Sequence, residues 1–239
     1  MTTDLWDELG RAQPTPPEWV ILVTAGLAVL VVLSSGPWRL ARNVVTIVHE
    51  AGHALVAVLA GRTLSGIRLH SDTSGVTVSR GKPTGPGMVC TAFAGYPAPS
   101  LVGLGFAALL GAGKITLLLW VATAVMLAVL VMVRNAYGVL SVLVTGGVLV
   151  GVSWLASTGT QAAFAYLITW FLLVAGIRPI GELQRKRADG RARDSDADQL
   201  ARLTGAPGLF WVAAFGLITV GSLLLAGSWL LADIITQVS

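Results

Sequence analysis

Three chemically active side chains stand close together in the segment His49-Glu50-Ala51-Gly52-His53. The residues around it, 44–48 and 54–60, are apolar except for Thr46, and such a run predicts a buried helix. Side chains four positions apart share one face of a helix, so both imidazoles can bind one Zn²⁺. Glu50 is the next residue round the helix, where it would act as general base toward a metal-activated water.

The surroundings of this segment favour a functional interpretation. A charged or strongly polar side chain at membrane depth costs a few kcal/mol, roughly 2.5–3.5 for Asp, Lys or Arg. Three such groups within five residues are therefore unexpected unless they have a role. The alternative is a hydrogen-bonded polar cluster that joins helices. His-Glu-x-x-His is a metalloprotease signature with a known mechanism, which favours the metal site.

The composition is that of a polytopic membrane protein. Of the 239 residues, 54% are hydrophobic and 12% are charged, and the mean hydropathy is +0.76. Several apolar runs approach the 20 residues that a helix needs to cross a bilayer. The sequence therefore predicts an all-α polytopic membrane protein with about seven transmembrane helices. The expected spans are about 19–35, 40–60, a third from 88, 114–133, 136–156, 161–177 and 209–235.

The charge pattern argues against a nucleic-acid partner. The net charge is +4 and the pI is about 9.7, but the basic residues lie mainly in the connections between spans. This placement indicates topology signals and contact with lipid headgroups of the bilayer. The single cysteine, Cys90, excludes an internal disulfide.

The chain divides into a polar N-terminal tail, residues 1–18, and one membrane-embedded domain, residues 19–239. Within the domain, residues 62–86 are polar and alternate around a turn, which predicts a small β-hairpin after the motif helix. The hairpin is either a solvated connector or a strand edge beside the metal that pairs with an extended substrate. The charged connection 178–206 contains a short helix with Ser195 or Asp196 as N-cap.

The distribution of basic residues predicts an orientation. With seven spans and the N-terminus inside, most of the 16 Lys and Arg residues fall on one side of the membrane. Cytoplasmic connections carry an excess of Lys and Arg. We therefore expect a cytoplasmic N-terminus, hairpin and charged connection, although a different number of spans would change this assignment.

A catalytic zinc usually has three protein ligands and one open position for water. His49 and His53 supply two of them, and the third histidine, His70, falls in the hairpin, so an Asp or Glu is expected. Zinc would lower the pKa of bound water toward about 7. Glu50 would take the proton of that water and pass it to the leaving amine. The carboxylates available for the third position are Asp72, Glu182, Asp194, Asp196 and Asp198.

The chain resembles the site-2 proteases, which are zinc intramembrane metalloproteases, and most closely their compact bacterial branch. The resemblance is carried by the motif 49–53, by Ser74-Gly75-Val76-Thr77, by Ala94-Gly95-Tyr96-Pro97 and by residues 195–204 before a last span. It implies a zinc-dependent intramembrane endopeptidase of a bacterial plasma membrane. The substrate would be a membrane-bound or transmembrane protein.

The sequence departs from this family at the third ligand. Typical site-2 proteases use an Asp in a Leu-Asp-Gly motif on a later span, preceded by an Asn-Pro pattern. No Leu-Asp-Gly occurs here, and Arg134-Asn135 is at best a remnant of the Asn. The compact branch implies Asp196 as the third ligand, with helix capping as its alternative role. If no carboxylate reached the metal, the chain would be an inactive scaffold or chaperone with the same fold.

Overall fold

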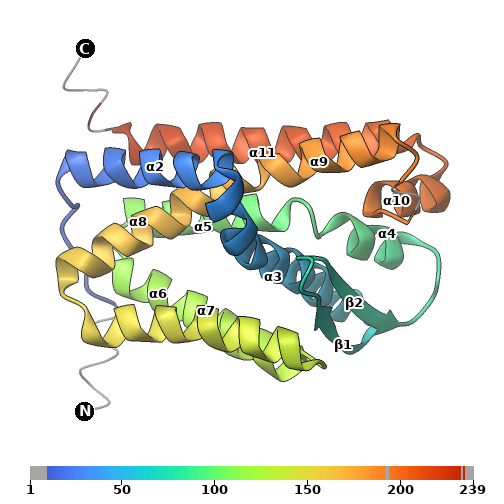
Figure 1. Cartoon of the computed structure of the whole chain (residues 1–239), viewed down its shortest axis with the longest axis horizontal. Helices are drawn as coiled ribbons and strands as arrows, with labels where there is room; N and C mark the ends of the chain where they lie inside the picture. Colours follow the sequence, from blue (N-terminus) through green and yellow to red (C-terminus); the bar gives the residue numbers. More distant parts are fainter. Residues whose placement is uncertain (1–9, 192–193, 233, 235–239) are drawn as a thin grey trace.

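The computed structural model describes residues 10–191, 194–232 and 234. These residues form a mainly helical structure with one two-stranded antiparallel sheet (Figure 1). Four helical stretches are long and apolar enough to cross a membrane. They are α6 (Ile115–Met132), α7 (Ala136–Leu155), α8 (Thr158–Ala175) continuing into α9 (Ile177–Ala188), and α11 (Gly208–Leu230).

Two further pairs of helices are sharply bent. The angle is 101° between α2 (Glu18–Leu33) and α3 (Ser35–Leu59), and 73° between α4 (Pro86–Phe93) and α5 (Ala98–Gly111). The structure therefore has up to six spans if each bent pair counts as one. The predicted seven are not confirmed, because the segments treated as the first two spans are the arms of a single bent pair.

A residue from much later in the chain stabilises the first bend. Pro37 stands in the opening turn of α3, where its missing N–H is tolerated. Arg178 of α9 donates to the Val32 carbonyl at the end of α2. Its guanidinium also lies 4.8 Å from the centre of the buried Trp38 ring, in a cation–π contact. Because one side chain touches both arms, the angle between them is fixed by tertiary contacts.

The predicted hairpin is present as β1 (Thr63–Leu69) and β2 (Gly75–Arg80). In its turn, the Asp72 carboxylate accepts hydrogen bonds from the side chain and the backbone N–H of Ser74, which lower the pKa of Asp72. Thr46 of α3 donates to the Thr73 carbonyl over 2.8 Å. These bonds hold the turn against the motif helix.

The connection between α6 and α7 fastens the other strand. The Arg134 backbone N–H donates to the Ile67 carbonyl over 2.9 Å. The Asn135 side chain accepts from the Leu69 N–H at 3.1 Å and donates to the Leu69 carbonyl at 2.6 Å. The Arg134-Asn135 pair thus positions the hairpin through β1.

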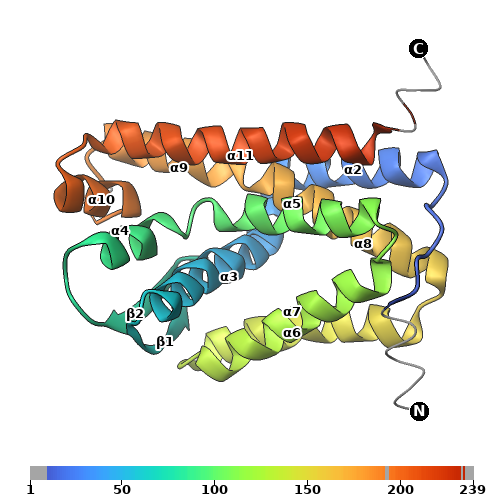
Figure 2. The same ribbon diagram turned by 180° about the vertical axis from the view of Figure 1, so that it is seen from behind.

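The described part of the N-terminal tail lies at the opposite end of α6 from the hairpin (Figures 1 and 2). The Gln13 N–H donates to the Gly113 carbonyl over 2.8 Å, and its side-chain oxygen accepts from the Thr116 N–H at the start of α6. The hairpin contacts the far end of this helix, roughly 27 Å away at 1.5 Å per residue. The structure thus separates the tail from the hairpin, whereas the seven-span count placed both on one side.

The short helix α10 (Asp196–Thr204) packs at the hairpin end of the molecule, between α4, α9 and α11 (Figure 2). Ala197 and Leu200 are completely buried there in one cluster with Phe215 of α11. Arg187 of α9 pairs with Asp198, and its guanidinium lies against the backbone of Gly208, where a side chain would collide with it. These contacts fix α10 to the two long helices beside it.

A glycine substitution tests the packing of α5 on α8. A Cβ at Gly103 would lie 2.9 Å from Leu173 Cγ and 3.1 Å from its backbone nitrogen. We expect Gly103→Ala to destabilise the protein by about 1–3 kcal/mol through overpacking. The matched control is Gly105→Ala on the same helix, where a Cβ meets no atom within 4 Å. Thermal unfolding in detergent checks this, and equal midpoints for both variants would contradict the close crossing.

Candidate metal centre

The structure brings His49, His53 and Asp196 together. The two Nε2 atoms are 3.1 Å apart, and Asp196 Oδ2 lies 3.3 Å from His49 Nε2 and 3.2 Å from His53 Nε2. The histidines lie one turn apart on α3, as predicted, while the carboxylate comes from α10. Among the described residues, these three form the one group of His, Cys, Asp and Glu side chains that could hold a metal ion.

The size of this triangle fits a tetrahedral metal site. Ligand atoms at zinc bond lengths of 2.0–2.1 Å and tetrahedral angles lie about 3.3 Å from one another. The three observed separations, 3.1 to 3.3 Å, agree with that value. Two imidazoles and a carboxylate are also a donor set that suits zinc. The residues present therefore fit the ion, with a fourth position left for another ligand.

A backbone carbonyl orients the ring of His53. Its Nδ1 lies 2.7 Å from the carbonyl oxygen of Thr91 on α4. We assign the proton to Nδ1, because a carbonyl can only accept. The lone pair of Nε2 then points toward His49 and Asp196, as a ligand to a cation requires.

Two neighbouring residues at the start of α10 have different roles, because one caps the helix and the other faces the histidines. Ser195 is the N-cap, since its Oγ accepts from the Asp198 N–H. The Asp196 carboxylate is thus left to face the histidines. Burial alone would raise the pKa of Asp196, but the facing imidazoles outweigh burial when they are protonated and hold the pKa well below its usual range. Asp196 is therefore an anion at neutral pH.

The other candidate carboxylates do not join this group. Asp72 lies in the hairpin turn, and Glu182 pairs with arginines of α3 and α9. Asp198 pairs with an arginine of α9, and the Asp194 side chain is fully exposed. Of the five carboxylates considered from the sequence, only Asp196 reaches the two imidazoles.

Glu50 is buried, with 4% of its surface exposed, and strand β2 passes directly over it. The Thr77 hydroxyl lies 2.6 Å from Glu50 Oε2 and 3.0 Å from the Glu50 carbonyl oxygen. A Cβ at Gly75 would lie 2.6 Å from Glu50 Oε1, so only glycine lets the strand come this close. From the sequence alone, Gly75 and Thr77 were expected in the hairpin, but neither was predicted to contact a residue of the site.

The break between α4 and α5 forms another wall of the site. A Cβ at Gly95 would lie 2.6 Å from His49 Nε2 and would also overlap His53 Nε2. The two imidazoles thus fill the space beside the backbone of Gly95. The next residue, Tyr96, contacts the His49 ring edge-on at 4.9 Å between ring centres and stacks on Phe215 at 5.0 Å.

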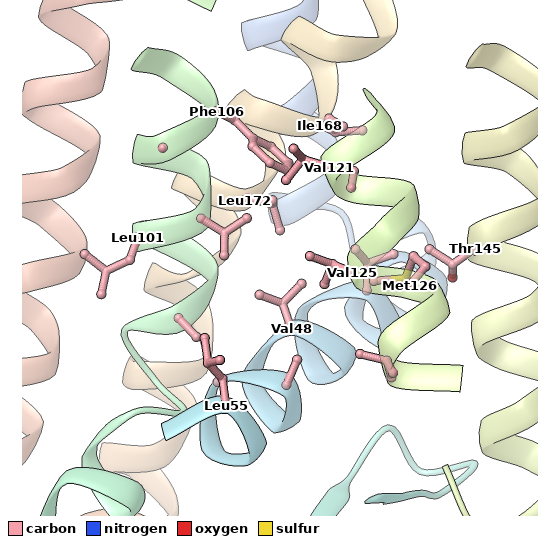
Figure 3. Close-up of a pocket in the computed structure, with 18 of the residues that line it drawn as sticks. Val48, Leu55, Leu101, Phe106, Val121, Val125, Met126, Thr145, Ile168 and Leu172 are labelled. Atoms are coloured by element: carbon pink, nitrogen blue, oxygen red, sulfur yellow. The ribbon is translucent and has the colours of Figure 1, made fainter. Parts of the chain in front are cut away.

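A large apolar cavity of about 1440 Å³ lies on the other side of the motif helix. Figure 3 labels lining residues of this cavity, among them Val48 and Leu55 of α3, Leu101 of α5 and Val125 of α6. The motif histidines, Glu50 and the α10 carboxylate do not line it. This cavity is thus separate from the polar group, and α3 lies between the two.

Replacing Gly95 tests the metal centre. We expect Gly95→Ala to weaken metal binding roughly 10- to 100-fold, because the new methyl group would occupy the space of the imidazole nitrogens. Zinc affinity measured in competition with a chelator checks this. Gly147→Ala on α7 is the matched control, since a Cβ there meets no atom within 4 Å. Equal zinc affinity in both variants would rule out the proposed ligand geometry.

Comparison with known proteins identifies the family of the chain. A family model described as Peptidase M50B-like matches residues 22–226, which include the motif helix, the hairpin and α10. Neither the curated proteins nor the solved structures gave a match. Because the match covers most of the sequence, the chain belongs to the Peptidase M50B-like family, the family of the site-2 proteases.

Proposed function

We propose that this protein is a zinc-dependent intramembrane endopeptidase that cleaves a membrane-bound or transmembrane protein. The observation that carries the proposal is the triangle of ligand atoms beside the buried carboxylate of Glu50. His49, His53 and Asp196 would hold the ion. When bound, zinc supplies a Lewis acid that activates water and polarises a carbonyl.

Glu50 is the proposed general base. Its carboxylate would take a proton from the attacking water and later give it to the leaving amine. The Thr77 hydroxyl donates to Oε2 and so fixes the direction of the carboxylate. Strand β2 covers this side of the site and restricts the access of bulk water.

The outer edge of β2 is the proposed binding surface for the substrate chain. Strand β1 lies between β2 and Val133, with which it forms a parallel bridge at Ile67. Among the described residues, no strand pairs with the other edge of β2. An extended peptide can add to such an edge through main-chain hydrogen bonds. Thr77 lies on this strand, so a peptide bound there would pass close to Glu50.

Charge supports an orientation in which the hairpin end is cytoplasmic. Most basic residues belong to the hairpin, to the α6–α7 connection and to the region of α9 and α10, which lie at that end (Figure 1). Arg11 and Lys114 belong to the tail and to the start of α6 at the opposite end. The positive-inside rule then places the metal centre toward the cytoplasm of a bacterial plasma membrane, with the described tail on the other side. The basic residues of the hairpin end are Arg62, Arg68, Arg80, Lys82, Arg134, Arg185, Lys186, Arg187, Arg191 and Arg202.

Metal analysis tests the ligand set. Purified wild-type protein is expected to hold about one zinc per chain, and both His49→Ala and Asp196→Ala are expected to lose it. Asp194→Ala removes a neighbouring but fully exposed carboxylate and should keep the metal. If Asp196→Ala retained zinc while His49→Ala lost it, Asp196 would not be the third ligand. A wild-type protein without metal would favour a non-catalytic scaffold with the same fold.

Replacing the base tests the chemistry separately from the metal. Glu50→Gln keeps the shape of the side chain and removes its basicity, so we expect unchanged zinc content and cleavage at least roughly 100-fold slower. Cleavage of a membrane-protein substrate in proteoliposomes, followed by gel electrophoresis, measures it. Activity equal to that of wild type would exclude Glu50 as the base.

A further inference from the structure

We propose that Tyr96 is a further catalytic residue, whose phenol hydroxyl donates a hydrogen bond to the oxygen of the scissile carbonyl as that oxygen becomes negatively charged. The inference rests on the proposed peptidase function. It assigns a role to a side chain that the ligand set and the general base leave unused.

The ring of Tyr96 is held at the site by its neighbours. It stacks on Phe215, a completely buried residue of α11, with 19° between the ring planes. Its edge contact with His49 has an interplanar angle of 88°. The preceding residue, Gly95, lies against the ligand nitrogens of both histidines. The phenol is thus a fixed part of the wall beside the metal position, carried by the break between two helices.

The charges of the site act on the phenol of Tyr96. The charged groups that act on it most strongly are Asp196, Arg42, Glu182 and Glu50. Arg42 and Glu50 lie on α3 and Asp196 lies on α10, the two helices that carry the metal group, and Glu182 lies on the neighbouring α9. Glu50 is also the proposed base. The phenol therefore stands in the electrostatic field of the metal group and of the proposed base.

The hydroxyl is also a free donor. Among the described residues it makes no hydrogen bond, although the side chain is more than half enclosed. Buried tyrosine hydroxyls normally have a partner, so this one is available to a bound molecule. Two other donors of the site are engaged, since Thr77 bonds to Glu50 and Arg42 pairs with Glu182 at 3.1 Å.

The chemistry of peptide hydrolysis requires such a donor. When the water oxygen bonds to the carbonyl carbon, the π electrons of the carbonyl move onto its oxygen, and Glu50 takes the proton. The C–N bond then breaks, and the amine leaves with that proton. The Tyr96 proton stays on the phenol throughout. Its hydrogen bond is stronger to the charged oxygen than to the planar carbonyl, and this difference accelerates the reaction.

The test is Tyr96→Phe, which keeps the ring and its stacking and removes only the hydroxyl. We expect unchanged zinc content, an unchanged KM and a kcat that is roughly 100-fold lower. Affinity for a phosphinic peptide, which carries the tetrahedral charged oxygen, should fall by a similar factor in calorimetry. Binding of the parent peptide to a Glu50→Gln background should stay the same. The matched control is Tyr137→Phe, which removes a hydroxyl that bonds to Asn43.

The outcomes separate this inference from the proposed function. An active wild type whose Tyr96→Phe variant keeps both kcat and phosphinate affinity would overturn the role of Tyr96 alone. Loss of zinc, or a raised KM with unchanged kcat, would also overturn it, because the residue would then be structural. A wild type that binds no zinc and cleaves nothing would overturn the proposed function itself, and the role of Tyr96 with it.

Discussion

Three hydrogen-bond acceptors that face one another inside a mostly apolar protein are the constraint on which the rest of the structure depends. Two imidazole nitrogens and a carboxylate oxygen meet at 3.1 to 3.3 Å, and one cation can satisfy all three. Such a group persists only if its members are held from outside. Thr91 orients one imidazole, and the buried contacts of α10 hold the carboxylate. Much of the architecture at the hairpin end supplies this support.

The motif helix is built with two unlike faces. One carries the ligand group and Glu50 and is enclosed by β2, by α10 and by the break after α4. The other carries aliphatic side chains such as Val48 and Leu55 and borders the large cavity. Polar chemistry is thus kept on the side where donors and acceptors find partners, while the opposite side needs none. Between these faces lies Gly52, whose missing side chain lets the break between α4 and α5 pack closely against the motif helix.

The local pattern of the sequence predicted the motif helix, the hairpin and the shared face of the two histidines. These features depend on spacing and alternation, which are visible within a few residues. The number of spans was not predictable in this way. Hydropathy shows two apolar segments, one before and one after Pro37. Their arrangement as one bent pair involves a hydrogen bond from Arg178 to Val32, which lies 146 positions earlier in the chain.

Asp196 shows a second limit of sequence reasoning. A carboxylate in the first turn of a helix has the same local signature whether it caps the helix or faces outward. The structure separates the two roles because Ser195 supplies the cap. Gly75, Thr77 and Gly95 were also invisible as site residues. Their importance comes from what lies opposite them in space, and the only signal was their place in segments that resemble the family.

The distance along the chain between the ligand residues has a consequence for biosynthesis. His53 and Asp196 are 143 positions apart, and α10 is packed in place by Phe215 of the final helix. A ribosome must therefore deliver the chain through α11 to the membrane before the third ligand can settle beside the first two. Partly made chains hold two imidazoles without their carboxylate partner. In the growing protein, the ligand group thus forms only after α11 has been inserted.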